Sequence, residues 1–297
     1  MKMGVEENSR AERALISDFA LSIRKNKLTA DAIHAFQNSI YAYYHEYGRK
    51  LPWRETNNPY HILVSEIMLQ QTQVERVIEK YNEFITAFPD FHSLAQAPLQ
   101  EILKIWHGLG YNRRALALKK IAEIVVTTYN GTLPSSLDVL MKLPGIGKYT
   151  ASAITTFAFN HPTVFIETNI RTVFIYFFFH DKDEINDSEI VPLVEKTLDT
   201  EHPRTWYYAL MDYGVMLKKQ YQNPNRRSAH YHKQTPFKGS NRQLRGMILK
   251  ALTRESSMSE RELVQTLKTD PERVKSILVQ LQNEGFIRKS RNNYRIA

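Results

Sequence analysis

Cysteine is absent from this sequence of 297 residues, and its absence excludes several kinds of site. A chain without thiols has no disulfide bond, no catalytic cysteine, no thiolate zinc site and no cysteine-ligated iron–sulfur cluster. Long apolar runs are also missing, since the longest, residues 172–179, is far shorter than the roughly 20 residues of a membrane-spanning helix. Residues 1–13 are charged and lack the apolar core of a secretory signal. We therefore expect a cytoplasmic protein without membrane contact, associated with the nucleoid if its source is prokaryotic.

Acidic residues are scarce toward the C-terminal end. Residues 218–297 hold 18 Lys and Arg but only 6 Asp and Glu, whereas the net charge of the whole chain is +9. The preceding residues are therefore slightly acidic, and the positive charge is concentrated in one part of the chain. Such a distribution is typical of proteins that bind a polyanion, most often nucleic acid, although a solvated basic face gives the same pattern.

Strand-like alternation of apolar residues is almost absent before residue 286, and helical spacing predominates. Apolar residues recur at intervals of three and four, with breaks at Pro, Gly and Asn–Gly positions between the periodic segments. This pattern indicates an all-α body. The predicted helices cover residues 11–25, 30–47, 60–71, 74–88, 99–106, 115–129, 136–142, 149–159, 170–178 and 189–198.

Residues 241–297 form a separate periodic unit after a basic, Pro- and Asn-rich linker, residues 223–240. Capping and turn residues divide this unit into three short helices, and a two-stranded hairpin follows them. This order is the plan of a winged helix-turn-helix, in which the third helix is the recognition element. Winged helices also serve as protein-interaction modules. The divisions rest on the capping box of Ser259 and Glu262, the helix start at Asp270–Pro271, Gly285, and the hairpin over residues 286–296.

The segment LPGIGKYTA, residues 143–151, carries the most informative motif. Two glycines that bracket one apolar residue allow a tight turn leading directly into a helix, so that backbone amides point outward and can bind a phosphate oxygen. A lone Gly-x-Gly also occurs in ordinary interhelical turns. The segment indicates a helix–hairpin–helix, and its candidate DNA contacts are Leu143, Gly145, Gly147, Lys148 and Thr150.

Two glutamates stand where an acid suits a catalytic function. Glu66 lies in the apolar segment SEIMLQQTQV, where burial would raise the pKa of a carboxyl and suit it to general acid catalysis. An exposed position on a polar helix face is the alternative. Glu167 follows an apolar run and precedes a helix, so it fits a catalytic carboxylate and an N-terminal helix cap equally well.

Two further segments suit contact with nucleic acid. Gln70, Gln71 and Gln73 form a polar tip, and glutamine side chains can enter a base stack or pair with an orphaned base. The turn WHGLGYNRR presents Tyr111 beside Arg113 and Arg114, which suits stacking and backbone contact. Ordinary surface positions for the glutamines, and core packing for Tyr111, are the alternatives.

Taken together, the motifs LPWR, SEIMLQQTQV, WHGLGY, LPGIGKYTA and ETNIRTV resemble, in order and spacing, the helix–hairpin–helix DNA glycosylases of the endonuclease III superfamily. The similarity runs from about residue 35 to residue 214 and is greatest to the A/G-specific adenine DNA glycosylases. The resemblance implies two helical lobes over residues 1–222, with a DNA cleft between them. It also implies a monomeric, monofunctional hydrolase of base excision repair. Such an enzyme flips adenine, paired with 8-oxoguanine or guanine, out of duplex DNA and removes it.

The resemblance also assigns individual roles. Glu66 matches the family's catalytic acid, which protonates adenine N7, and Glu167 occupies the place of the catalytic aspartate that stabilises the oxocarbenium-like sugar. Tyr149 stands where bifunctional relatives carry a Schiff-base lysine, so we expect base removal without efficient strand cleavage. The glutamate at position 167 is one methylene longer than aspartate. A shift of about 1 Å in a preorganised site can cost roughly a hundredfold in rate, so slow or retuned chemistry is expected.

Two departures from the family alter the expected cofactor and specificity. The family's four-cysteine iron–sulfur cluster cannot form, so no cofactor is expected beyond a monovalent cation of the kind that such hairpins often hold. The basic tract 218–238 then supplies candidate DNA backbone contacts, with a solvated linker as the alternative: Lys218, Lys219, Arg226 and Arg227. The Nudix-like domain that reads 8-oxoguanine is replaced by the winged-helix-like unit. Excision of mismatched thymine, uracil or another damaged base, and a catalytically weak lesion-binding protein, are therefore the alternative functions.

Overall fold

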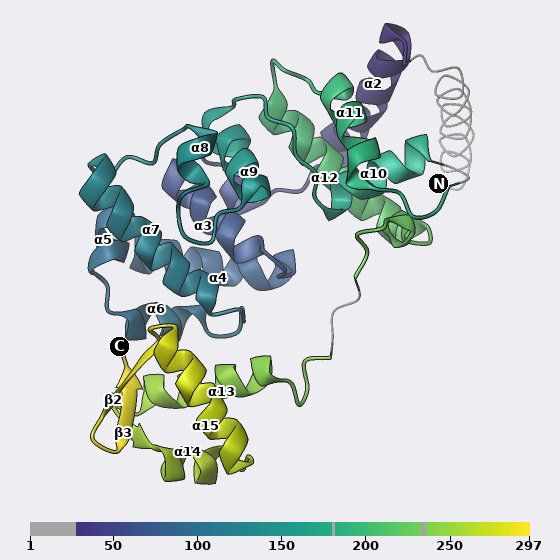
Figure 1. The fold of residues 1–297 in the computed structure, drawn as a ribbon. Helices are drawn as coiled ribbons and strands as arrows, with labels where there is room; N and C mark the ends of the chain where they lie inside the picture. The colour runs from purple at the N-terminus through teal and green to yellow at the C-terminus, as the bar shows by residue number, and fades with distance from the viewer. Residues whose placement is uncertain (1–27, 180–181, 233–235) are drawn as a thin grey trace. The chain divides into compact units, whose positions relative to one another are not determined.

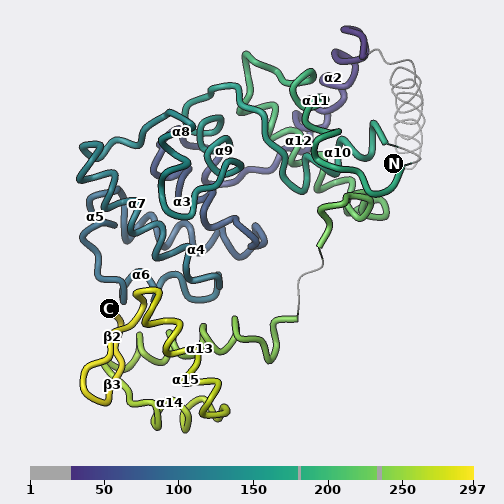
Figure 2. Tube along the Cα trace, in the orientation of Figure 1, coloured from purple at the N-terminus to yellow at the C-terminus, as the bar shows by residue number. Residues whose placement is uncertain are grey.

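Helices dominate this chain, whose computed structural model describes residues 28–179, 182–232 and 236–297 (Figures 1 and 2). The helix expected over residues 11–25 lies outside the described residues. The chain divides into two compact units, of which the first comprises residues 1–50 and 151–233 and the second residues 51–150 and 234–297. Within the described ranges, no helix is long and apolar enough to cross a membrane.

The first unit is a group of helices around an aromatic core. Its elements are α2 (Ala30–Tyr47), α10 (Thr168–Phe178), α11 (Asp187–Thr197), α12 (Pro203–Gln220) and the 3₁₀ helix η2 (Pro224–Arg227). Phe36 on α2 makes edge contacts with Phe177 on α10 and Trp206 on α12, at centroid distances of 5.2 and 5.7 Å. α12 packs against both other helices. These rings therefore hold α2, α10 and α12 together.

The second unit begins with seven elements: η1 (Pro52–Arg54), α3 (Pro59–Leu69), α4 (Val74–Ala87), α5 (Phe91–Gln96), α6 (Leu99–Trp106), α7 (Arg113–Tyr129) and α8 (Leu137–Leu140). α3 packs on α4, α4 on α6, and α5 on α7. Trp106 is fully buried and contacts the ring of Phe84, with the centroids 6.0 Å apart. The helix α9 (Lys148–Phe159) follows and contains the point at which the chain passes into the first unit.

Residues 241–297, which we call the C-terminal module, belong to the second unit. The module consists of α13 (Asn241–Arg254), β1 (Met258–Ser259), α14 (Glu260–Leu267), α15 (Pro271–Asn283), β2 (Ile287–Ser290) and β3 (Asn293–Ile296). The three strands form an antiparallel sheet in the order β1–β3–β2. Helix α13 packs on α6, as Figure 1 shows near the C-terminus of the chain.

The capping residues of the C-terminal module lie where the sequence predicted them. Ser259 Oγ accepts a hydrogen bond from the Glu262 amide, and the Glu262 carboxylate accepts one from the Ser259 amide, which completes the capping box. Asp270 caps α15 by accepting from the Arg273 amide (2.9 Å). Gly285 ends the helix with a φ of +82°, in the left-handed region that favours glycine.

Most predicted helices are present, with ends shifted by about two residues at most. α5 was not predicted, because six residues are too few to show a period. α12 was also missed. Much of its circumference is buried, including Tyr208, Asp212 and Gly214, so it lacks the polar face that produces an amphipathic pattern. β1 has only two residues and gives no recognisable alternation.

The first part of the expected linker, residues 223–240, is folded. After η2, the Ile185 amide donates to the Arg227 carbonyl oxygen (2.9 Å) and the Ala229 amide to the Ile185 carbonyl oxygen (3.0 Å), which forms a parallel bridge between Ile185 and Ser228. This segment belongs to the first unit, and the second unit resumes at residue 234. The sequence predicted a glycosylase domain, a linker and a winged-helix-like unit, one after another along the chain. Each of the two observed units instead combines two separate stretches of the chain, and the winged-helix-like unit belongs to the same unit as residues 51–150.

Candidate active site

Glu66 lies on α3, a helix in which most other side chains are buried. Asn58 caps this helix by accepting a hydrogen bond from the Tyr60 amide (2.9 Å), and Pro59 occupies the first helical position. Ile67, the next residue after Glu66, is 1% exposed, whereas Glu66 itself is half-buried. The burial of Glu66 is therefore intermediate between the two alternatives that the sequence left open, a buried acid and an exposed residue on a polar helix face.

Arg114, on α7, fastens the C-terminal end of α3. Its Nη1 donates to the carbonyl oxygens of Ile67 (3.0 Å), Met68 (2.8 Å) and Gln70 (2.5 Å). Carbonyls at the end of a helix have no partner within it, so a cationic donor there stabilises the helix. Burial lowers the pKa of the Arg114 guanidinium to about 10, which leaves the group charged at neutral pH.

The same guanidinium holds the turn between α6 and α7. Its Nη2 donates to the carbonyl oxygens of Leu109 (3.3 Å) and Gly110 (3.2 Å), and to Thr72 Oγ1 (3.0 Å). The guanidinium carbon also lies 5.5 Å from the ring centroids of Trp106 and Tyr111, within the range of a cation–π contact. One side chain thus connects the loop after α3 with the turn before α7.

Both connected loops contain a residue other than glycine in the left-handed region. Gln71 has a φ of +54° and Tyr111 a φ of +46°, a conformation that costs roughly 1–2 kcal/mol for an L-residue. Arg114 binds the carbonyl oxygen of the residue before each of them, Gln70 and Gly110. These hydrogen bonds fix the preceding peptide groups, so two of the predicted DNA contacts are held in strained conformations without a ligand.

The predicted hairpin turn is held by its apolar residues. Leu143 and Ile146 are each 5% exposed, so the Leu143 side chain anchors the turn and only its backbone is suited to ligand contact. Gly145 has a φ of +75°, and a Cβ there would lie 3.1 Å from that of Ala117. Gly145 and Gly147 are exposed. The turn therefore presents backbone to solvent, as phosphate binding requires.

Residues at the start of α9 differ in exposure. Lys148 is exposed and Tyr149 is 36% exposed, whereas Thr150 is 5% exposed. The Thr150 hydroxyl accepts a hydrogen bond from Gln70 Nε2 (3.2 Å). This bond connects the end of α3 to the first turn of α9. Gln70 and Thr150 were both predicted DNA contacts, and here they contact each other, while Gln71 and Gln73 are exposed.

Tyr111, on the turn before α7, and Arg113, the first residue of α7, contact the C-terminal module. Arg242 Nη1 donates to Tyr111 Oη (2.6 Å), and its guanidinium carbon lies 5.6 Å from the tyrosine ring centroid. Glu284 accepts from Arg113 (2.7 and 3.0 Å) and from Arg245. Hydrogen bonding to Arg113 is the main cause that lowers the pKa of Glu284 to about 2. The module therefore covers part of the turn that the sequence assigned to DNA.

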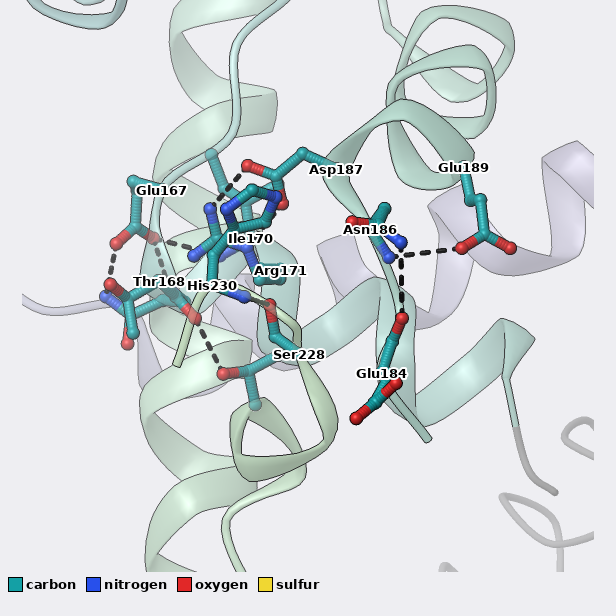
Figure 3. A network of polar contacts seen from close by, with 12 residues as sticks. Glu167, Thr168, Ile170, Arg171, Glu184, Asn186, Asp187, Glu189, Ser228 and His230 are labelled. Carbon is teal, nitrogen blue, oxygen red and sulfur yellow. Dashed lines mark hydrogen bonds and ion pairs between the residues drawn. The ribbon is translucent and has the colours of Figure 1, made fainter. Parts of the chain in front are cut away.

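Glu167, in the first unit, caps the N-terminus of α10. Its Oε1 accepts from the backbone amides of Asn169 (2.7 Å) and Ile170 (2.9 Å), and its Oε2 accepts from Asn169 Nδ2 (3.2 Å). Figure 3 shows the carboxylate beside Thr168 and Ile170 at the start of the helix. The cap expected as one alternative is thus present. A cap also fixes a carboxylate in position, so the structure does not oppose a catalytic role for the same group.

Lys218, on α12, contacts this cap indirectly. Its Nζ donates to Asn169 Oδ1 (2.8 Å), and burial lowers its pKa, although the charge of Glu167 acts in the opposite direction. Gly214, one helical turn earlier, allows this approach. A Cβ at Gly214 would lie 2.3 Å from the Asn169 carbonyl oxygen. Lys218, predicted to contact the DNA backbone, therefore supports the residue that holds Glu167.

The next residues of α10 are fixed by an ion pair. Arg171 donates to both carboxylate oxygens of Asp187, at 2.6 and 2.7 Å. Partial burial of Asp187 opposes its ionisation, but the hydrogen bond and charge of Arg171 outweigh this effect and lower the pKa of the carboxyl. In Figure 3 the His230 ring lies beside this ion pair, and the His230 amide donates to Ser228 Oγ (3.0 Å). The segment after η2 therefore lies beside the ion pair of Arg171 and Asp187.

Arg227 occupies the other end of α10. It donates to the carbonyl oxygens of Ile175 (3.2 Å) and Phe179, as Arg114 does for α3. Arg226, in contrast, is exposed. Of the four basic residues predicted here as DNA contacts, Lys219 and Arg226 are exposed in a way that suits a phosphate contact.

The segment after α12 does not fit the iron–sulfur cluster of the resembled family. Such a cluster needs thiolate ligands, whereas the chain contains no cysteine and this segment offers ammonium, amide, guanidinium and hydroxyl groups. Among the described residues, no group of three or more His, Asp or Glu side chains is placed to hold a metal ion.

Two residues that the structure places in these networks, Asn169 and Gly214, were not singled out in the sequence. Arg114 was predicted as a contact for nucleic acid, but it is 8% exposed and its donors bind carbonyl oxygens of the protein itself. A signal existed for Arg114, because it shares the apolar face of α7 with Leu118 and Ile121, and a cation on such a face needs internal acceptors. Asn169 and Gly214 gave no signal. Their contact joins residues far apart in the chain, which periodicity does not reveal.

Comparison with known proteins shows what this chain is similar to. Residues 64–196 match the family described as HhH-GPD superfamily base excision DNA repair protein. Its sequence is 42% identical to the adenine DNA glycosylase of Buchnera aphidicola subsp. Baizongia pistaciae, over 187 residues that cover 61% of this chain and 52% of the relative. The chain therefore spans about half the length of that relative.

Solved structures agree with the predicted helical fold. A thermostable thymine-DNA glycosylase is similar with a TM-score of 0.55 and 28% identity, covering 62% of this chain and 86% of that one. Endonuclease III, in a non-covalent complex with DNA, has a TM-score of 0.53 at 21% identity, covering 63% of this chain and 86% of that one. The resemblance and the helical fold class predicted from the motifs are thus confirmed.

Proposed function

We propose that this chain is a monofunctional DNA glycosylase that releases adenine from duplex DNA in which adenine is paired with 8-oxoguanine or guanine. The observation that carries the proposal is the position of Glu66, half-buried on an apolar helix whose end Arg114 fixes. The similarity to a curated adenine DNA glycosylase supports adenine as the base. We further propose that the chain acts as a monomer and without an iron–sulfur cluster.

Glu66 supplies the proton in the proposed reaction. As the bond between C1′ of the sugar and N9 of adenine breaks, its electron pair passes to the base, and the Glu66 carboxyl protonates N7. The half-buried position suits this step, because an apolar environment favours the neutral, protonated form of a carboxyl. The base leaves as neutral adenine, and the sugar is left as an oxocarbenium-like cation.

Glu167 supplies the negative charge that stabilises this cation. Two backbone amides and the Asn169 side chain already hold the carboxylate, so little reorganisation is needed as positive charge develops. Water then adds to C1′ and loses a proton, which gives an abasic site. Tyr149 offers no amine for a Schiff base, so the strand stays intact.

Single-turnover base release on a panel of duplexes tests the proposal. The duplexes contain adenine, thymine, uracil or hypoxanthine opposite guanine or 8-oxoguanine, and alkali reveals abasic sites. Wild-type protein is expected to release adenine, and Glu66→Gln to abolish release while duplex binding is retained. Glu79→Gln, an exposed glutamate on α4, is the matched control. Unchanged release by Glu66→Gln would exclude Glu66 as the acid.

Release of thymine is the second candidate function. It is favoured by the similarity to the thermostable thymine-DNA glycosylase and by the glutamate at position 167, where the resembled family carries aspartate. The same panel separates the candidates, because release of thymine alone would move the specificity within the same fold. Binding without any release would indicate a lesion-binding protein.

A further inference from the structure

The β2–β3 hairpin of the C-terminal module contains basic but no acidic residues. Arg288, Lys289, Arg291 and Arg295 are all exposed, and residues 285–297 include neither Asp nor Glu. Among the described residues, none of these four cations forms an ion pair. Glu284, which immediately precedes the hairpin, is occupied by Arg113 and Arg245. The hairpin therefore has a positive surface that the protein itself does not neutralise.

Two of these cations stand directly opposite each other. Arg288 and Arg295 are register partners in the antiparallel pair of β2 and β3, and their neighbours Ile287 and Tyr294 are buried on the other face. Like charges directly opposite in a sheet are destabilising. The arrangement therefore works against folding of the free protein, and an anion bound between the two guanidinium groups would relieve the repulsion.

Helix α15 presents a different kind of surface. Val274, Ile277, Leu278 and Leu281 are buried on its inner face. Ser276, Val279 and Asn283 lie on the opposite face, all exposed, and Val279 is 51% exposed. Short polar side chains beside an apolar one are suited to base edges in the major groove, where hydrogen bonds and contact with the thymine methyl group distinguish sequences. Lys275 adds a positive charge beside this face, whereas Glu272 places an acid on the face itself, one turn before Ser276.

The module presents both elements from a fixed base. Arg273 donates to the Gly239 carbonyl oxygen and to Asn241 Oδ1, both at 3.0 Å, which attaches the start of α15 to the start of α13. Gln100 on α6 donates to the Thr253 carbonyl oxygen (3.1 Å), and the Glu284 network ties the end of α15 to the turn before α7. The module is thus held within the second unit.

We propose that α15 and the β2–β3 hairpin form a second binding surface for duplex DNA, in which Arg288 and Arg295 contact phosphates and the outer face of α15 lies in the major groove. The surface is separate from the residues proposed to release the base. It would add affinity along the duplex whichever base is excised, and it accounts for the opposed arginines.

Charge removal tests the hairpin. Binding of an undamaged duplex is measured against salt concentration for the full chain, for Arg288→Ala/Arg295→Ala, and for the matched control Arg254→Ala/Arg261→Ala, which removes two exposed cations elsewhere in the module. The hairpin variant is expected to bind roughly tenfold more weakly, and its log–log salt slope to be smaller by about 1.8, which corresponds to two phosphate contacts. The control should match the wild type. Equal losses in both variants, or no loss in either, would overturn the proposal.

A second pair of variants tests the helix. Val279→Glu places a negative charge on the outer face of α15, and Gln265→Glu places one at an exposed position of α14. Only Val279→Glu is expected to weaken duplex binding, and thermal unfolding should show that both variants fold. Competition by single-stranded RNA and by anionic vesicles identifies the preferred polyanion. If the hairpin variant loses binding to either of these but not to duplex DNA, the assignment to a duplex is wrong.

Discussion

The two glutamates of the candidate active site are held in contrasting ways. Glu66 lies within an apolar helix, and the structure around it is fixed from outside by one guanidinium that reaches two loops. Glu167 lies at a helix N-terminus, and backbone amides of that helix bind its carboxylate directly. The first arrangement leaves a half-buried side chain on an apolar helix, and the second anchors a carboxylate. The contrast matches the acid and the charge-stabilising roles proposed for the two residues.

The two helices nevertheless share one device. Arg114 binds carbonyl oxygens at the C-terminal end of α3, and Arg227 binds those at the C-terminal end of α10. Arg114 is buried and serves two loops, whereas Arg227 is half-buried and attaches η2 to α10. The same kind of hydrogen bond thus supports two different sites. Substitutions of residues at the two sites should therefore differ in the size of their effect and in the property that they change.

The largest effect is expected from Arg114→Ala. Several carbonyl groups would lose their donor, and each buried unsatisfied group costs about 1–3 kcal/mol. We therefore expect the free energy of unfolding to fall by about 3 kcal/mol or more, as measured by urea denaturation. Arg113→Ala is the neighbouring control and should cost about 1 kcal/mol or less, because its partner Glu284 keeps Arg245. Similar losses in both would mean that Arg114 has no special structural role.

A loss of activity rather than of stability is expected from Glu167→Gln. The amide keeps an oxygen that accepts from the backbone of α10 but lacks the negative charge, so single-turnover release should slow by roughly a hundredfold or more. Glu167→Ala should in addition lower the free energy of unfolding by about 1 kcal/mol through loss of the cap. Release at the wild-type rate by Glu167→Gln would show that the residue acts only as a cap.

Gly214→Ala tests the contact between α12 and the start of α10. The new Cβ would lie 2.3 Å from the Asn169 carbonyl oxygen, so the backbone must shift, at a cost of about 1–3 kcal/mol in stability. Gly246→Ala on α13 is the matched control, since nothing lies within 4 Å of its Cβ. It should leave stability unchanged or raise it by up to about 1 kcal/mol. Thermal unfolding of the pair would contradict this account if both variants responded alike.

The smallest effect concerns Glu284 and pH. Its pKa is lowered from 4.5 to about 2 in the folded protein. The stabilisation from its ionised form is therefore complete above pH 4.5 and is lost as the pH falls toward 2. Glu284→Gln should lower the free energy of unfolding at neutral pH by about 1 kcal/mol or less. That difference should shrink between pH 4.5 and pH 2 in urea titrations. A constant difference across this range would mean that the carboxylate contributes through shape alone.

Local signals in the sequence predicted much of this structure. Ser259, Asp270 and Gly285 specify the ends of helices through hydrogen bonds and φ values that neighbouring residues determine. Lys218 shows where such reasoning fails. Its charge predicted a position on the surface, but its partner Asn169 is 49 residues away in the chain. Only the packing of α12 on α10 brings the two together.

The candidate site could likewise be predicted only in part from the sequence. Glu66 and Glu167 could be found from family motifs, and the cap at Glu167 from its place before a helix. The conformations of Gln71 and Tyr111 could not be, because neither residue type favours the left-handed region. Their conformations follow from Arg114, whose hydrogen bonds to both loops depend on the packing of α7 against α3.

This shared guanidinium makes the two loops a single cooperative unit. Arg114 donates to the Gln70 carbonyl oxygen in one loop and to the Gly110 carbonyl oxygen in the other. Opening the loop at Gln71 releases the side chain that also positions the turn at Tyr111. The backbone amides of both loops should therefore exchange with solvent in one local unfolding event. If a duplex binds these loops as proposed, ordering one loop would lower the entropy lost in ordering the other. The two loops would then engage a strand together or leave it together.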